Sequence, residues 1–479
     1  MAGYVFEGDR HGTVRPLGAS LPTFILQNET ANMKRNRLFE WSIVAALAGF
    51  IFGFDTVVIS GANLPIKELW HTSPLFHGFF IMSMALWGTL FGAIFGGIPT
   101  ERYGRKKVLF WIGVLFAFSA LGSALAPSPY IFSFFRFVGG LGIGVSSVVA
   151  PTYISEISTP ATRGRLGAMY QFNIVFGILA AFLSNYFLQG VGGANDWRWM
   201  LGVLAIPSII YTIMVMGVPE SPRWLITERN DLAGARRILL LMGVADPEKE
   251  IESVLESNRH EGRQVVFFSS RHAPMIWLAF LIAFFNQLSG INFILYYAPE
   301  ILTKIGFGAR DSLLNSIAIG GTNLVFTFLG LYLIDRLGRR KLLFIGSLGY
   351  ILSLVMVAVC FALHVRPGLL MVFLLLFIAA HAVGQGAVVW VFISEIFPNK
   401  VRAAGQSFGA SVHWVFAAVI TLVTPFFLDG KNGVFKDNPW PIFAFFAGMM
   451  VLQLVWVMIR MPETKGVSLE QIEQKLTNS

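Results

Sequence analysis

The chain has 479 residues, of which 55% are hydrophobic and only 13% are charged. Soluble proteins carry roughly a quarter charged residues, so this composition excludes a water-soluble globular protein and indicates that the chain lies in a lipid bilayer. The formal net charge of +9 does not indicate a nucleic-acid partner, because the basic residues gather in short loops between apolar runs.

Twelve apolar runs follow one another along the chain, each close to the roughly 20 residues that a helix needs to cross a bilayer. The runs are continuous, whereas the strands of a membrane barrel alternate between polar and apolar residues. We therefore predict an all-α membrane protein with twelve transmembrane helices, at 41–62, 77–98, 108–126, 130–154, 166–189, 197–218, 274–299, 312–334, 342–364, 368–394, 405–428 and 440–461.

Basic residues occupy alternate short loops, at 34–37, 102–107, 163–165, 336–341 and 400–402. Loops rich in lysine and arginine stay in the cytoplasm, which predicts that both termini are cytoplasmic. The one long polar interruption contains two charged, helix-like stretches, at 231–242 and 247–258. We expect five parts: a cytoplasmic N-terminal tail (1–38), a six-helix half (39–218), a cytoplasmic helical linker (219–272), a second six-helix half (273–461) and a cytoplasmic C-terminal tail (462–479).

Asp55 interrupts the first apolar run, where a charge costs about 2.5–3.5 kcal/mol and suggests a function if a partner can be named. Arg136 in the fourth run is the predicted partner, because both residues lie some 10 Å below the outer surface at about 1.5 Å per helical residue. A proton that neutralises Asp55 would remove its attraction to Arg136 and free the first helix to move. A static structural ion pair is the alternative.

Two motifs occur in the same order in both halves of the chain. The sequence Glu-Arg-Tyr-Gly-Arg-Lys-Lys at 101–107 follows the second run, and Asp-Arg-Leu-Gly-Arg-Arg-Lys at 335–341 follows the eighth. A glutamate and an arginine seven residues apart also follow the fourth and the tenth runs, as Glu156 with Arg163 and Glu395 with Arg402. This internal duplication is typical of transporters whose two halves rock around a midplane site.

The charged groups of these motifs lie at inner helix ends, where carboxylates and guanidinium groups can form bidentate ion pairs. Pairs that join the two halves would hold the inner side closed while the outer side is open. Independent surface ion pairs, each worth about 0–1 kcal/mol, are the alternative. The predicted gating residues are Glu101, Arg102, Arg105, Glu156, Arg163, Asp335, Arg336, Arg339, Glu395 and Arg402.

Six short strings connect the chain with a known family, namely Pro-Thr-Tyr-Ile-Ser-Glu at 151–156, Pro-Glu-Ser-Pro-Arg-Trp-Leu at 219–225, Ser-Gly-Ile-Asn at 289–292, Tyr-Tyr at 296–297, Ser-Glu-Ile-Phe-Pro at 394–398 and Pro-Glu-Thr-Lys-Gly at 462–466. In these strings the chain resembles the sugar porter family of the major facilitator superfamily. The resemblance implies the major facilitator fold, with two pseudo-symmetric six-helix halves, and transport of a monosaccharide (hexose or pentose) by alternating access.

The resemblance also bears on energy coupling. Proton-coupled members have an aspartate at the position of Asp55, whereas facilitative members typically have a neutral residue there, so a bacterial proton-coupled symporter of the xylose, glucose or arabinose type is favoured. A facilitative uniporter is the alternative, and a non-transporting sugar sensor would need a longer cytoplasmic tail. The implied partners are a monosaccharide, protons and the lipid bilayer, with no nucleic acid, and we expect a monomer in a bacterial inner membrane.

Amide side chains suit a sugar because they both donate and accept hydrogen bonds, and aromatic planes suit the sugar ring. The family counterparts of most of these residues line the sugar pocket, and the seventh helix is expected to break near Gly290. The family usually has Gln at the position of Asn286 and Gln or Asn at that of His413, and the stretch around Gln385 lacks the family's usual prolines. The predicted sugar-binding residues are Gln171, Asn286, Gln287, Asn292, Tyr297, Asn323, Gln385, Trp390, His413 and Trp414.

Other features of the sequence carry no predicted chemistry. No motif indicates a cofactor, a metal site or an enzyme. The glycine-rich stretch 139–144 lies in an apolar helix and indicates close helix packing and not a dinucleotide site. The single cysteine, Cys360, excludes an internal disulfide, and His71 and His77 are expected to be isolated and exposed.

Overall fold

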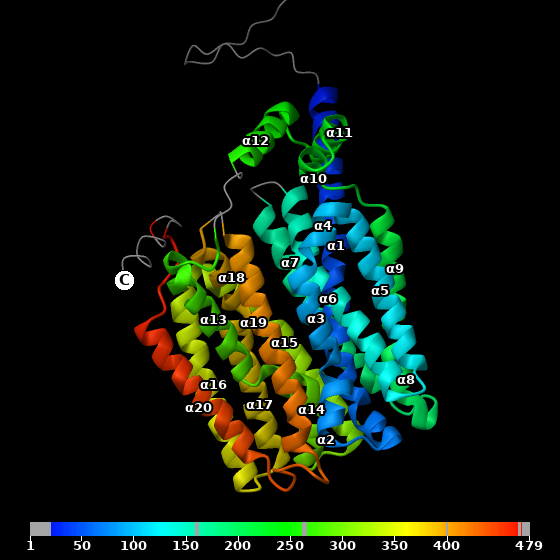
Figure 1. The fold of residues 1–479 in the computed structure, drawn as a ribbon, viewed down its shortest axis with the longest axis vertical. Coiled ribbons are helices and arrows are strands. Elements are labelled where there is room, and N and C mark those ends of the chain that lie inside the picture. The colour runs from blue at the N-terminus through cyan, green and yellow to red at the C-terminus, as the bar shows by residue number, and fades with distance from the viewer. Residues whose placement is uncertain (1–20, 159–161, 261–265, 399–400, 468–470, 472–479) are drawn as a thin grey trace, which may run out of the picture.

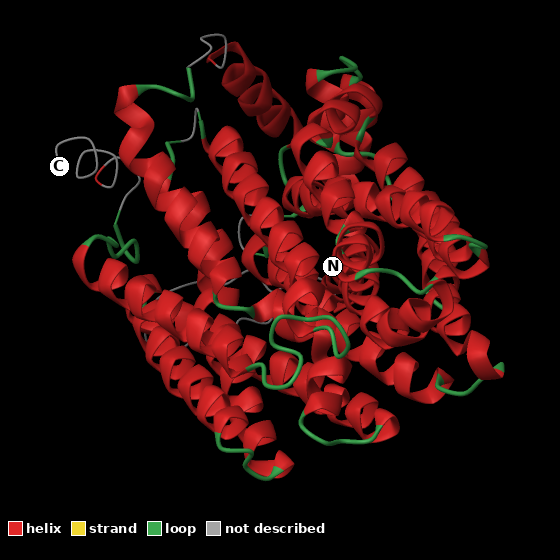
Figure 2. Ribbon diagram, turned by 60° about the horizontal axis from the view of Figure 1, so that its bottom comes forward, coloured by secondary structure: helices red, strands yellow, loops and turns green. Residues whose placement is uncertain are grey.

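The computed structural model describes residues 21–158, 162–260, 266–398, 401–467 and 471, without the side chains of 21–36, 163 and 258–260. Every regular element within these ranges is a helix (Figures 1 and 2). Eleven helices are long and apolar enough to cross a membrane, and a pair bent by 42°, Pro74–Met82 with Met84–Phe95, makes the number twelve if it is one span. The predicted all-helical membrane fold is therefore confirmed.

The first half of the bundle is formed by the helices from α1 to α9, drawn in blue, cyan and green in Figure 1. The long helices of this half form because their apolar runs are long enough to cross a membrane. The elements of the first half are α1 (Leu21–Trp70), α2 (Pro74–Phe76), the π-helical turn η1 (His77–Met82), α3 (Met84–Phe95), α4 (Gly97–Tyr103), α5 (Arg105–Leu125), α6 (Pro129–Ile157), α7 (Arg163–Leu188), η2 (Gly193–Asn195), α8 (Asp196–Gly202) and α9 (Ala205–Met216).

Three short helices connect this half to the second one: α10 (Pro222–Thr227), α11 (Leu232–Met242) and α12 (Pro247–His260). The last two coincide with the two charged stretches that predicted helices. The second half consists of η3 (Ser270–His272), α13 (Ala273–Leu288), α14 (Ile291–Lys304), α15 (Ala309–Leu337), α16 (Arg339–Ala362), α17 (Pro367–His381), the π-helical turn η4 (Ala382–Gly386), α18 (Ala387–Ile396), α19 (Arg402–Leu428) and α20 (Trp440–Ile459).

The two ends of the bundle differ. We call the end that carries α10, α11 and α12 the basic end, since the duplicated basic motifs lie there (top of Figure 1). The opposite end carries α2, the α7–α8 connection and the loop between α19 and α20. The predicted N-terminal tail is described only from residue 21 onward, where it is already part of α1.

Glycines bring α3 and α6 into close contact. A Cβ atom added at Gly140 would lie 2.0 Å from the carbonyl oxygen of Ala85, and one at Gly144 would lie 2.2 Å from that of Thr89. These distances are shorter than any van der Waals contact, so the glycines are required for packing. The glycine-rich stretch therefore has the predicted packing role, and it lies one turn beyond Arg136 on α6.

Two spans of the second half depart from a regular α-helix. Gly290, with a φ of 86°, separates α13 from α14, so the seventh span breaks where it was expected to. Tyr297 within α14 also has non-helical angles, and Pro299 follows it. In the tenth span the π-helical turn η4 separates α17 from α18. A discontinuous span such as the seventh often marks the region where a transported molecule binds.

Candidate transport site

Asp55 and Arg136 form a buried ion pair between α1 and α6. The Nη1 atom of Arg136 lies 2.5 Å from Oδ1 of Asp55, and Nη2 donates to the main-chain carbonyl oxygen of Asp55 at 3.2 Å. Each side chain is only 2% exposed. The contact that the depths of the two residues predicted is therefore present, and each charge compensates the other within the apolar bundle.

The second carboxylate oxygen of Asp55 takes no part in the ion pair with Arg136. Oδ2 of Asp55 is buried and accepts no hydrogen bond from the described residues. A Cβ atom added at Gly139 would lie 3.7 Å from it, so α6 offers only backbone there. Tyr296 on α14, from the other half, lies beside Thr56 and the ion pair.

The break in the seventh span gathers a cluster of polar side chains from α13, α14 and α19. The amide nitrogen of Gln287 donates to Oδ1 of Asn286 at 3.0 Å and lies 3.0 Å from Nε2 of His413. Asn292 donates to Oε1 of Gln287 at 2.7 Å. These four residues form one network in which Gln287 is the centre, and we call it the amide cluster.

Aromatic rings border the amide cluster. The ring of His413 lies 5.0 Å from that of Trp390 and 4.8 Å from that of Trp414, between centroids. Phe52 on α1 reaches Trp414 from the first half, at 5.8 Å. The cluster therefore combines amides, an imidazole and indole planes, which are the groups that recognise hydroxyls and a sugar ring.

Two further residues predicted for the sugar site lie in other polar networks. Tyr297 is fully buried and donates to the carbonyl oxygen of Thr421 at 2.8 Å. Gln385 in η4 donates to Gln453 of α20 and accepts from the hydroxyl of Tyr350 on α16 at 3.2 Å. Hydrogen bonds of this kind connect helices within a membrane, and the structure does not join either residue to the amide cluster.

The remaining two candidates come from α7 and α15, which pack against each other. Gln171 is half-buried on α7 and Asn323 is buried on α15. Neither side chain forms a hydrogen bond with the amide cluster within the described parts of the chain.

The duplicated motifs form two matching ion pairs at the basic end. Arg105 donates to both oxygens of Glu156 at 2.9 and 2.8 Å, and Arg339 donates to both oxygens of Glu395 at 3.0 and 2.7 Å. Arg339 also contacts Asp335 at 3.2 Å. Each pair joins helices of one half. Neither of these two pairs joins one half to the other.

The other predicted gating residues are placed as follows. The guanidinium groups of Arg102 and Arg336 lie over neighbouring tyrosine rings, at 5.5 and 4.0 Å from the ring centroids. Arg402 donates to the carbonyl oxygen of Phe397 at 3.4 Å, and the side chain of Glu101 is exposed. The side chain of Arg163 lies outside the described residues.

Two glutamates that were not predicted complete the duplicated motifs. Glu220 accepts hydrogen bonds from the main-chain nitrogens of Arg105 and Lys106, at 2.9 and 3.0 Å. Glu463 does the same for Arg339 and Arg340, at 2.9 and 3.1 Å. Both carboxylates therefore cap the start of a helix. The Pro-Glu dipeptide that follows the last helix of each half was a signal that could have identified them.

The opposite end holds a polar network that sequence reasoning missed. Asn63 on α1 donates to Oε2 of Glu300 on α14 at 2.7 Å. Nε2 of His77 lies 2.7 Å from Oδ1 of Asn63, and Lys67 on α1 forms an ion pair with Asp429 after α19. We call these five residues the outer network, and they join the two halves.

His77 corrects an expectation, since it is 1% exposed and not a surface residue. Its Nδ1 atom accepts from Thr72 at 2.8 Å while Nε2 faces Asn63, an arrangement that suits a neutral ring with its proton on Nε2. Its two partners, Thr72 and Asn63, enclose the imidazole, which a count of apolar residues could not indicate. His71 is exposed, as expected.

Comparison with known proteins agrees with this arrangement. The family described as "Sugar (and other) transporter" matches residues 41–476. The chain belongs to the sugar porter family. It is 34% identical over 441 residues to an arabinose-proton symporter of Bacillus subtilis, covering 90% of this chain and 94% of that one. It is 31% identical to the D-xylose-proton symporter of Escherichia coli, covering 91% and 95%.

Solved structures give the same result for the fold of this sugar porter. An inward-open structure of the xylose transporter XylE from Escherichia coli matches with a TM-score of 0.80 and 31% identity, covering 91% of this chain and 99% of that one. XylE bound to 6-bromo-6-deoxy-D-glucose matches with a TM-score of 0.75 and 29% identity, covering 92% and 100%. The chain is therefore a multi-pass membrane transporter for sugars and not an enzyme.

Proposed function

We propose that this sugar porter is a proton-coupled symporter that imports a monosaccharide, a hexose or a pentose, across a bacterial plasma membrane. The observation that carries the proposal is the buried pair of Asp55 and Arg136, in which one carboxylate oxygen has no partner among the described residues. The relatives named as arabinose-proton and xylose-proton symporters support the same reading. The basic end faces the cytoplasm, in keeping with the loop charges.

The amide cluster is the proposed sugar site. Gln287 and Asn292 already share one hydrogen bond, so a sugar that enters can replace this bond with bonds to its own hydroxyls without leaving buried polar groups unpaired. Trp390, at 38% exposed, presents an indole face beside His413. Gln171 and Asn323 would approach the sugar from α7 and α15 when the two halves close around it.

Helix α14 connects the proposed sugar and proton sites. Its residues Asn292, Tyr296 and Glu300 are spaced four apart, and they contact Gln287, the surroundings of Asp55, and Asn63 respectively. Protonation of Asp55 weakens its hold on Arg136 and lets α1 move against α14. Because α14 also carries Asn292, this movement is coupled to sugar binding.

The structure is proposed to be the inward-facing state. The outer network ties the halves together at the end away from the basic motifs, whereas each described ion pair at the basic end stays within one half. The higher TM-score to inward-open XylE than to the form bound to a glucose analogue supports this assignment.

Facilitated diffusion is the second candidate function. It is favoured if the Asp55–Arg136 pair is static, which its complete burial allows. Uptake into proteoliposomes distinguishes the two. Glucose, xylose, arabinose, galactose, fructose and inositol would each be tested with and without an imposed pH gradient. Accumulation of one sugar that collapses with a protonophore supports symport, and equilibration without accumulation supports facilitation.

A further inference from the structure

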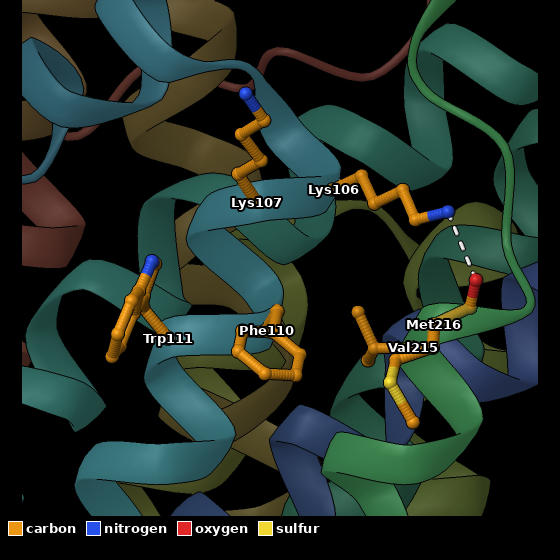
Figure 3. Close-up of a pocket in the computed structure, with 6 residues that line it drawn as sticks. All are labelled: Lys106, Lys107, Phe110, Trp111, Val215 and Met216. Atoms are coloured by element: carbon orange, nitrogen blue, oxygen red, sulfur yellow. Dashed lines mark hydrogen bonds between the residues drawn. The ribbon is translucent and has the colours of Figure 1, made fainter.

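A groove of about 250 Å³ lies at the basic end between the start of α5 and the end of α9. Figure 3 shows Lys106 and Lys107 at its upper edge, with the aromatic rings below them. Nζ of Lys106 donates to the carbonyl oxygen of Met216 at 2.9 Å and so connects the two helices. The groove is lined by Lys106, Lys107, Phe110, Trp111, Val215 and Met216.

The groove belongs to the lipid-facing surface of the bundle. Trp111 is 61% exposed, and Phe118 and Leu125 are exposed further along α5. Ile209 and Ile213 are exposed on the neighbouring α9. An apolar surface of this kind on a membrane-spanning helix pair faces acyl chains, and a tryptophan near its end is typical of the level of the lipid headgroups.

The positive charge in the groove is available to a ligand. Lys107 is exposed and forms no ion pair with any residue within the described ranges. Lys106 has two further N–H groups besides the one that it gives to Met216. The main-chain N–H groups of Arg105 and Lys106 are already bound by Glu220, so the two ammonium groups are what an anion would meet.

We propose that this groove binds the headgroup of an anionic phospholipid in the leaflet at the basic end. The phosphate would lie between Lys106 and Lys107, and the glycerol backbone and first acyl carbons against Phe110 and Trp111. Basic pockets between membrane helices are suited to anionic headgroups, and the exposed apolar wall favours a lipid over a free phosphate ion. This site is separate from the proposed sugar and proton sites, so it does not depend on them.

The duplicated motif provides a matched control. Lys341 occupies in the second half the position that Lys107 occupies in the first. Arg340, like Lys106, donates to carbonyl oxygens at the end of the last helix of its half, with Nε of Arg340 3.2 Å from the oxygen of Val457. The position of Trp111, however, is taken there by Ile345. If surface charge alone attracts the lipid, removing the charge of Lys107 or of Lys341 should weaken lipid binding equally. If the groove is a specific site, only the change at Lys107 should weaken it.

The test is native mass spectrometry of the purified full-length protein with phosphatidylglycerol and phosphatidylcholine of the same acyl chains. Lys107→Gln should weaken retention of one phosphatidylglycerol about fivefold, as expected for one cation at a membrane surface, and Lys106→Gln should have a similar effect. Lys341→Gln should leave this lipid bound as in the wild type.

Four results would overturn the proposal. The first is equal retention of phosphatidylglycerol by wild type, Lys107→Gln and Lys106→Gln. The second is equal retention of phosphatidylcholine and phosphatidylglycerol by the wild type. The third is a loss of phosphatidylglycerol in Lys341→Gln as large as that in Lys107→Gln. The fourth is displacement of the lipid by millimolar inorganic phosphate, which would assign the lysines to a free anion.

Discussion

Asn63 donates a hydrogen bond to Glu300 at 2.7 Å, although the two residues belong to different halves of the chain. Asn63 lies about two helical turns beyond Asp55 on α1, and Glu300 lies about two turns beyond Asn292 on α14. The helices that carry the proposed proton and sugar sites are therefore joined directly at the end opposite the basic motifs. Movement of one of these helices must change this contact.

Asn63→Leu should shift the protein toward the outward-facing state, because it removes both hydrogen bonds that Asn63 makes to Glu300 and His77. Loss of a buried hydrogen bond costs about 1–3 kcal/mol when a partner is left unpaired. The distance between spin labels at Leu75→Cys and Val434→Cys, in a Cys360→Ser background, should lengthen.

Glu300→Gln is the matched control for this prediction, since its amide oxygen still accepts from Asn63. The spin-label distance should remain close to that of the parent protein. If the spin-label distance distribution is identical in Asn63→Leu and the parent, the outer network has no role in gating.

Gln287→Ala should weaken sugar binding by about 1–3 kcal/mol, roughly five- to 150-fold in Kd, because Gln287 is the centre of the amide cluster. Isothermal titration of the purified protein with its transported sugar measures the effect. Gln385→Ala should leave the Kd within about twofold, since Gln385 bonds only Tyr350 and Gln453 among the described residues. Equal losses in both variants would contradict the assignment of the site.

His413 allows a finer prediction about specificity. Its ring meets Gln287 and lies 5.0 and 4.8 Å from the rings of Trp390 and Trp414, at a position where the family usually has an amide. His413→Gln should therefore keep binding within about tenfold while changing the ranking among sugars, because an amide bonds hydroxyls with a different geometry. Competition of several sugars for uptake gives that ranking, and an unchanged order would exclude a role for the imidazole in selectivity.

Glu395→Gln should slow transport and alter the balance between the two states, because it removes a bidentate ion pair with Arg339. Glu156→Gln makes the same change in the other half, against Arg105. Uptake rate under saturating sugar and the spin-label distance described above are the readouts. If both variants transport at the wild-type rate with unchanged distances, these pairs are only structural.

Sequence reasoning predicted the helices and the contact between Asp55 and Arg136, for identifiable reasons. Continuous apolar runs fix where the chain crosses the bilayer, and Asp55 and Arg136 were paired because a helix converts residue number into depth. The Ser-Gly dipeptide before Ile291 indicated the break in the seventh span. The helices and the break in the seventh span can each be inferred from one segment of the sequence. The Asp55–Arg136 pair needs two segments, but the membrane fixes the depth of each residue.

The missed features depend on how distant segments approach one another. Asn63 and Glu300 lie near helix ends in the sequence, and nothing local indicates that the halves bring them together. Gln385 was included because amides suit a sugar; it donates to Gln453 in this structure, and its place in the sugar site stays a prediction. His77 was assigned to the surface because nothing in the local sequence indicates that Thr72 and Asn63 enclose it.

The most direct test of proton coupling is Asp55→Asn in proteoliposomes with an inward pH gradient. Asparagine keeps the shape of the side chain but cannot take up a proton, so the variant should exchange labelled sugar across the membrane and fail to accumulate it. Wild-type protein should accumulate the sugar, and a protonophore should abolish that accumulation. Accumulation driven by the pH gradient in Asp55→Asn would contradict the assignment of Asp55 as the proton-binding residue.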